Sequence, residues 1–234
     1  RIPVGANQIF QLYKAKTASI FEIIGFVILA IIIIMGVVMI QEGQRRIPVQ
    51  YAKRVVGRKM YGGQSSHIPL KVNQAGVIPV IFAMSIIEFP KQIVGFFPGS
   101  GAYAFFNKYF AWGTWLHGIL YALLIIGFTY FYTAVTFNPV EVSNNIKKYG
   151  GFIPGIRPGK PTSDFIQRSL SRITLVGAIF LALIAILPIF IMAFTNIKIF
   201  FGSTSLLIVV SVAMETVKQI EAQMIMRNYQ GFLK

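Results

Sequence analysis

The sequence predicts an all-α polytopic membrane protein, in which five transmembrane helices are connected by long basic loops. Two features of the composition indicate this class. Hydrophobic residues make up 55% of the 234 positions and charged residues only 12%, about half the charged fraction of a soluble domain. In addition, 22 lysines and arginines stand against 7 acidic residues, and a basic excess on so apolar a chain is typical of a membrane protein with basic loops.

The spans are predicted from uncharged apolar runs that approach the roughly 20 helical residues needed to cross a bilayer. Three runs reach this length unaided, at about 20–40, 115–137 and 173–194. Two shorter runs, at about 75–92 and 199–217, need flanking residues or shielding by protein to complete a crossing. Pro79 lies inside the first of these shorter runs.

The distribution of basic residues predicts how the spans are oriented, because lysines and arginines in short loops are retained on the cytoplasmic side. Loop 41–74 carries seven of them and loop 138–172 carries six, whereas the loops between carry two and one. We therefore expect both basic loops and the C-terminus in the cytoplasm and the N-terminus outside. A chain that starts outside without a signal sequence is expected to be the C-terminal piece of a longer protein.

The outer loop before the third span is rich in aromatic residues, with nine of them between Phe96 and Trp115. Such side chains favour the membrane interface, where a ring lies partly in water. An interfacial anchor is therefore expected here, and a ligand-binding aromatic box is the alternative.

The residue types that perform catalysis are scarce. There is no cysteine and there are only two histidines, His67 and His117, neither with a second ligand at metal spacing. The central part of every predicted span lacks Asp, Glu, Lys and Arg, which proton or ion paths would require. The stretch Gly155 to Lys160 also fails as a phosphate-binding loop, because its glycines are too close together and Pro161 replaces the required Ser or Thr. We predict no enzyme activity and no cofactor, with any energy supplied by a partner.

The two basic loops have contrasting patterns. In loop 41–74 apolar and basic residues interleave at short spacing, which predicts a two-stranded hairpin or a twisted extended arm. The glycines and prolines of loop 138–172 rule out one continuous helix and favour short helices or arms joined by a stiff turn that exposes Phe152, Ile156 and Arg157. The basic residues by themselves are consistent with contact to anionic lipids. A backbone constrained by so many glycines and prolines favours a docking site instead.

Four stretches carry a resemblance to a known family. These are GQRRIPVQYAKRVVGRKMYGGQSSHIPLKVNQAGVIPVIFAMSI from Gly43, FNPVEVSNNIKKYGGFIPGIRPGKPT, RITLVGAIFLALIAILP and FFGSTSLLIVVSVAMET. In this order they closely resemble bacterial SecY, the central subunit of the Sec protein-conducting channel of the bacterial plasma (inner) membrane. The resemblance covers nearly all of residues 1–234 and implies the C-terminal half of the pseudo-symmetric channel bundle, its helices six to ten. Without the N-terminal half, such a fragment is not expected to conduct.

The resemblance also implies roles for residues in the spans. It places Ile81 and Ile208 at the hydrophobic pore constriction, which seals against ions by dewetting. Without it, both would be ordinary packed or lipid-facing isoleucines. The 73–87 segment resembles one wall of the lateral gate, the exit for signal sequences and membrane segments. The gate residues it implies are Asn73, Pro79, Ser85 and Ile86, with Thr204 as a further polar group. For Asn73, Ser85 and Thr204, a helix-cap or internally bonded role stays open.

Finally, the resemblance implies a docking surface for the SecA motor or the ribosome. Arginine forks suit protein carboxylates and the phosphates of ribosomal RNA alike. Further implied partners are the N-terminal half, SecE, SecG, signal sequences, translocating polypeptides and anionic lipids. A secondary transporter or a membrane scaffold is the alternative function, and a scaffold would tolerate replacement of Arg157. The docking residues implied are Arg45, Arg46, Lys53, Arg54, Arg58, Lys59, Lys147, Lys148 and Arg157.

Overall fold

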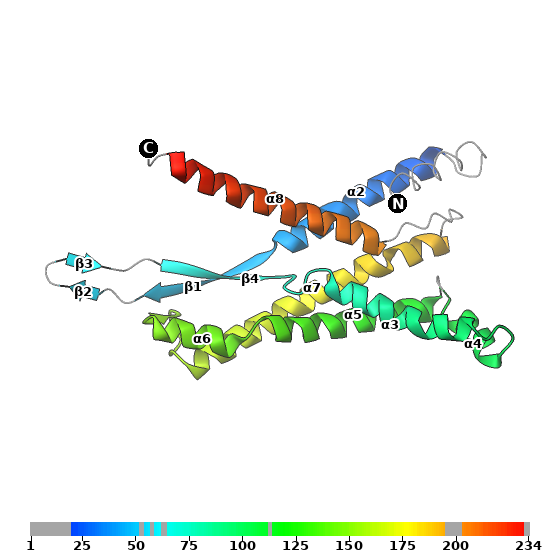
Figure 1. Ribbon diagram of the computed structural model, residues 1–234, viewed down its shortest axis with the longest axis horizontal. Coiled ribbons are helices and arrows are strands. Elements are labelled where there is room, and N and C mark those ends of the chain that lie inside the picture. The colour runs from blue at the N-terminus through cyan, green and yellow to red at the C-terminus, as the bar shows by residue number, and fades with distance from the viewer. Residues whose placement is uncertain are drawn as a thin grey trace.

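The computed structural model describes residues 20–51, 54–56, 59–61, 65–111, 114–194 and 203–231. Helices dominate these residues, so the predicted all-α polytopic fold class is confirmed, with a three-stranded sheet and a two-stranded sheet in addition (Figure 1). The elements, in chain order, are α2 (Ile20–Glu42), β1 (Gln44–Tyr51), β2 (Arg54–Val56), β3 (Lys59–Tyr61), β4 (Ser65–Lys71), α3 (Ile78–Gly95), α4 (Gly101–Tyr109), α5 (Trp115–Thr136), α6 (Pro139–Lys148), β5 (Gly151–Phe152), α7 (Lys160–Phe194) and α8 (Ser203–Gly231). The three-stranded sheet consists of β4, β1 and β5, and the two-stranded sheet consists of β2 and β3.

The long helices α2, α3, α5, α7 and α8 run in alternate directions along the long axis of the molecule (Figure 1). The sheet, α6 and the end of α8 therefore lie at one end, and α4 lies at the other. Three helical stretches of the described residues are long and apolar enough to cross a membrane: Ile78–Gly95, Trp115–Lys148 and Lys160–Leu187. Val27–Glu42 is apolar but shorter.

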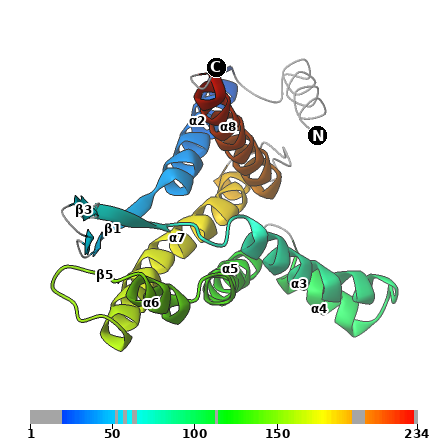
Figure 2. The same ribbon diagram turned by 60° about the vertical axis from the view of Figure 1, so that its left-hand side comes forward.

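The long helices meet in one hydrophobic core, named here the span cluster. Figure 2 shows α2 and α8 on one side of α7, and α5, with α3 beyond it, on the other side. Small residues on α7, among them Ala178, Ala182 and Ala185, allow the close helix approach that packing in a membrane requires. The span cluster consists of Val37, Val80, Ala83, Ile87, Tyr121, Ile125, Leu181, Ala182, Ile184, Ala185 and Leu207.

Helix α7 is longer than the sequence predicted. Its 35 residues begin at Lys160, so the last third of predicted loop 138–172 is helical and continuous with predicted span 173–194. The reason is local packing, since Ile166 and Leu170 on this first part of α7 are buried against the sheet and α6. At about 1.5 Å per residue, α7 is roughly 50 Å long and exceeds the hydrocarbon thickness.

Candidate docking surface and channel residues

The two basic loops, far apart in sequence, fold together. Strand β1 pairs antiparallel with β4, from Gln44 opposite Lys71 to Gln50 opposite Ser65, which confirms the predicted hairpin. On its other side β1 pairs with β5 of the second loop. A Cβ on Gly151 would lie 2.8 Å from Cε1 of Tyr51, so this close pairing depends on glycine. The sequence did not predict the pairing, because a strand of two residues has no periodicity to read.

A separate hydrophobic core, named here the loop cluster, lies under this sheet. Alternation along β1 turns Ile47 and Val49 inward and leaves Arg46, Pro48 and Gln50 exposed. Each fully buried aliphatic side chain contributes about 1.5–3 kcal/mol to folding, so the loop cluster gives the two loops their own stability. Its buried members are Ile47, Val49, Leu70, Ile146, Ile153, Ile166 and Leu170. We call the unit of β1, β4, β5, α6 and the first part of α7 the loop module.

Helix α6 ends with two of the predicted docking lysines. It begins at the N-cap Asn138, whose side-chain oxygen accepts from the backbone N–H groups of Val140 (3.1 Å) and Glu141 (3.4 Å). Lys147 and Lys148 lie exposed in the last turn, where the negative end of the helix dipole favours cations. The sequence of α6 therefore places a positive pair at the edge of the loop module.

The stretch Ile153–Gly159, named here the Arg157 turn, follows β5. The N–H of Ile156 donates to the carbonyl of Ile153 at 3.0 Å, across Pro154 and Gly155, whose φ of +81° suits a type II turn. Phe152 and Arg157 are exposed, as predicted. The predicted exposure of Ile156 is wrong, because this side chain is half-buried against the loop cluster.

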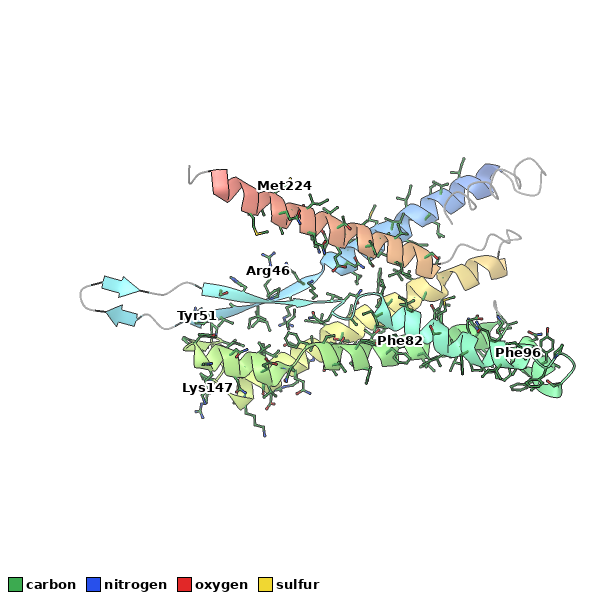
Figure 3. The ribbon with its side chains drawn as sticks, viewed as in Figure 1. Arg46, Tyr51, Phe82, Phe96, Lys147 and Met224 are labelled. Carbon is green, nitrogen blue, oxygen red and sulfur yellow. The ribbon has the colours of Figure 1, made fainter. Side chains whose placement is uncertain are left out.

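The loop module holds the described cations of the predicted docking set. Figure 3 shows Lys147 toward the end of the molecule with the sheet, Arg46 nearer the middle, and Phe96 at the opposite end. Within the described part of the chain, none of these cations forms a salt bridge, whereas Lys91 and Glu88 form one on α3. Lys53 and Arg58 lie outside the described residues, and Arg54 and Lys59 lie on β2 and β3 with no described side chains. The exposed cations of the predicted docking set, without a salt bridge among the described residues, are Arg45, Arg46, Lys147, Lys148 and Arg157.

The two predicted pore residues lie on two different helices. Ile81 on α3 is 41% exposed, and Ile208 on α8 is half-buried. Their chain neighbours Val80 and Leu207 are both buried in the span cluster. Each isoleucine is therefore more exposed than the core residue that precedes it.

The predicted gate residues surround the start of α3. Pro79 lies in the first turn of α3 and not inside it, a position that proline tolerates, and Pro90 is the proline inside the helix. Asn73, in the link from β4 to α3, is 9% exposed, and its buried Oδ1 has no donor among the described residues. The Oε1 of Gln74 is buried in the same way.

Ser85 has the internal hydrogen bond that was expected as one alternative for it. Its hydroxyl donates to the carbonyl of Ile81 one turn earlier at 2.8 Å, so it is bonded internally. Ile86 is 46% exposed on the same helix. Thr204 falls in α8, but its side chain lies outside the described residues.

Two features of the gate region were missed from the sequence. A Cβ on Gly177 of α7 would lie 2.5 Å from the carbonyl oxygen of Val72, so this glycine lets the link from β4 to α3 rest directly on α7. In addition, Phe82 on α3 meets Phe128 and Tyr132 of α5, with ring centroids 5.9 Å and 5.5 Å apart. A contact between aromatic side chains on two separate helices gives no signal in one sequence.

The outer connection between α3 and α5 runs through α4, which has no buried residue. Its N-cap Ser100 accepts from the N–H of Tyr103 at 3.2 Å, and its aromatic rings contact one another, such as Phe105 and Tyr109 at 4.9 Å. His117, at the start of α5, is buried, whereas His67 on β4 is exposed. The described residues hold no group of three or more potential metal-ligating side chains.

A family model described as SecY matches residues 1–217. The chain is 50% identical to protein translocase subunit SecY of Halalkalibacterium halodurans, over 100% of this chain and 56% of that protein. It is 49% identical to the same subunit of Mycobacterium leprae, over 100% and 55%, and 44% identical to that of Thermotoga maritima, over 92% and 49%. The chain thus spans about half the length of the curated relatives it matches.

Proposed function

The chain belongs to the SecY family, and from this premise we propose that it is the C-terminal half of a passive channel for secretory polypeptides. The N-terminal half completes the pore, and the five long helices all cross the membrane. The channel has no catalytic activity of its own, and a docked partner supplies the energy. The loop module and the C-terminus face the cytoplasm, and α4 faces the opposite side.

The observation that carries this proposal is the joining of two basic loops into one folded module. Loops used only for orientation in the membrane would need positive charge but no shared core, because topology depends on the number of lysines and arginines. Here β1 of the first loop pairs with β5 of the second, above a core to which both loops contribute. Five exposed cations without salt bridges within the described part of the chain are held on this frame.

The partner that docks here is anionic, and we assign the surface to the SecA motor and, in turn, the ribosome. Arg157 supplies a planar fork of donors that fits a carboxylate or a phosphate in the same way. Cations of the loop module also contact anionic lipids while the partner is docked. The small subunits SecE and SecG complete the assembly.

The pore itself depends on the apolar residues Ile81 and Ile208. Bulky apolar side chains at a constriction exclude water and ions, yet yield to a passing chain without a bound ion or a proton path. Both isoleucines are more exposed than the core residues that precede them, and they need the N-terminal half to complete a ring. Signal sequences leave through a lateral gate at α3, which Asn73, Pro79, Ser85 and Ile86 line.

The polar link into α3 supports the lateral gate. A buried amide oxygen without a donor is costly, and Asn73 leaves such an oxygen among the described residues. A donor from the N-terminal half or from a passing polypeptide would satisfy it. Gly177 allows this link to rest on α7, so the start of α3 is fixed while the rest of the helix lies on α5.

The test is charge reversal at Arg157 in the complete channel, reconstituted with its N-terminal half and small subunits. We expect Arg157→Glu to reduce motor-driven translocation of a secretory precursor by about 10- to 100-fold, as for an arginine that dominates an interface. Lys108→Glu is the matched control, because it reverses an exposed charge on α4, at the opposite end of the molecule. Normal translocation by Arg157→Glu would contradict the docking role of this arginine.

A further inference from the structure

Two buried hydroxyls hold the backbone at Arg157 and two residues after it. The Oγ1 of Thr162 donates to the carbonyl of Arg157 at 2.9 Å, and the Oγ of Ser143 donates to the carbonyl of Gly159 at 2.8 Å. Thr162 comes from the start of α7 and Ser143 from α6. The turn that presents Arg157 is therefore tied to both helices that flank it.

The bond from Thr162 differs from the usual bond of a helical threonine. Hydroxyls inside helices donate to the carbonyl three or four residues earlier, as Thr133 does to Thr129 at 2.7 Å. The hydroxyl of Thr162 instead reaches five residues back, beyond the first residue of α7, into the Arg157 turn. The acceptor of this hydroxyl is thus a carbonyl of the turn, so the bond ties the start of α7 to the Arg157 turn.

Both hydroxyls are withdrawn from water. Thr162 is 1% exposed and Ser143 is 2% exposed. A buried hydroxyl is costly unless it is bonded, so each side chain favours the backbone position that offers it a carbonyl. Arg157 itself is exposed, and its side chain is free to meet a partner while its main-chain carbonyl is held.

The sequence of the turn requires such support. Gly155 and Gly159 adopt positive φ, at +81° and +100°, and glycine has more backbone freedom than any other residue. Pro154 and Pro158 restrict only their own φ. Without further hydrogen bonds, the turn would lose backbone entropy when a partner bound Arg157. The affinity of the partner for the turn would fall as a result.

We propose that Thr162 and Ser143 are positioning residues, which hold the Arg157 turn in the geometry that receives the docking partner. The inference rests on the docking function proposed for Arg157. It adds two side chains that do not touch the partner and that no charge pattern would indicate.

The test compares near-isosteric variants of Thr162 in the complete reconstituted channel. Thr162→Val removes the hydroxyl and keeps the shape. We expect the SecA concentration for half-maximal translocation to rise about 3- to 10-fold, the range for one lost hydrogen bond, with the rate at saturating SecA unchanged. Thr162→Ser keeps the hydroxyl and should restore the wild-type value. Ser143→Ala should act in the same direction, and Thr133→Val is the control for loss of a buried threonine hydroxyl elsewhere.

A spectroscopic readout separates positioning from simple stability. This chain has no cysteine, so Lys160→Cys gives it a single thiol for a spin label beside the turn. Label mobility should increase with Thr162→Val but not with Thr162→Ser or Thr133→Val, while the melting temperature of the complex stays the same.

The possible outcomes are distinct. If Arg157→Glu blocks docking while Thr162→Val and Ser143→Ala leave both SecA affinity and label mobility unchanged, the positioning role is overturned and the docking function stands. Failure of Thr162→Ser to restore affinity would also overturn it. If Arg157→Glu has no effect, the docking function fails and this inference fails with it.

Discussion

The loop module and the outer connection through α4 both join long helices, and both are rich in residues that could face a partner. In the loop module, seven aliphatic side chains are buried in the loop cluster, and the cations lie outside it. In α4 no residue is buried, and Phe105, Tyr103 and Tyr109 are exposed. The difference indicates that one connection is ordered by its own core, whereas the other needs an external apolar surface. The proposed orientation supplies that surface as the outer membrane interface.

The largest expected effect comes from opening the loop cluster. Ile166 on α7 is 0% exposed, and Ile166→Ala should destabilise the loop module by about 2–5 kcal/mol, because the cavity adds to the lost burial. Amide hydrogen exchange should show this as faster exchange along β1 and β4. The matched control is Ile93→Ala on α3, where the side chain is 46% exposed and the effect should be small. Equal effects at the two sites would contradict a separate core.

An intermediate effect is expected where the loops meet the membrane part. Gly177→Ala forces a Cβ to within 2.5 Å of the Val72 carbonyl, so the link into α3 must shift, at a cost of about 1–3 kcal/mol. Gly127→Ala on α5 meets nothing within 4 Å and should be neutral or slightly stabilising. Thermal unfolding of the reconstituted complex would measure both variants. A harmless Gly177→Ala would show that α7 and the link are not tightly packed.

The smallest effect on stability is expected at the outer connection. Phe105 is 53% exposed, so Phe105→Ala should change the free energy of unfolding in detergent by less than about 1 kcal/mol. If α4 lies at the interface, the same variant should reduce quenching of nearby tryptophan fluorescence by brominated lipids. A large loss of stability would instead indicate that α4 packs as tightly as the loop module.

Local patterns in the sequence predicted the helical elements well, and contacts between distant segments poorly. Apolar runs located the helices at 20–40 and 115–137, and alternation located the hairpin of β1 and β4. The pairing of β1 with β5 and the extension of α7 to Lys160 depend on the loop cluster, which joins residues from four elements. Such a cluster has no periodicity of its own, so one sequence does not reveal it.

The candidate sites divide in the same way. Exposure of Arg157 followed from its glycines and prolines, and Ser85 proved to be one of the internally bonded alternatives. The roles of Ile81 and Ile208 came from resemblance alone, because an apolar residue in an apolar helix carries no local signal. Thr162 and Ser143 were missed, since a serine or threonine near a turn is common and only its acceptor distinguishes it.

Helix α7 connects the loop module to the span cluster as one continuous rod. It begins directly after the Arg157 turn and continues without a break to Ala185 in the span cluster, a distance of roughly 40 Å. A rod of that length acts as a lever. A tilt of about 5° at the docking end displaces the other end by about 3 Å, given the same rise per residue. If a partner docks at the loop module as proposed, a push there would reach the packed helices as sideways movement of α7.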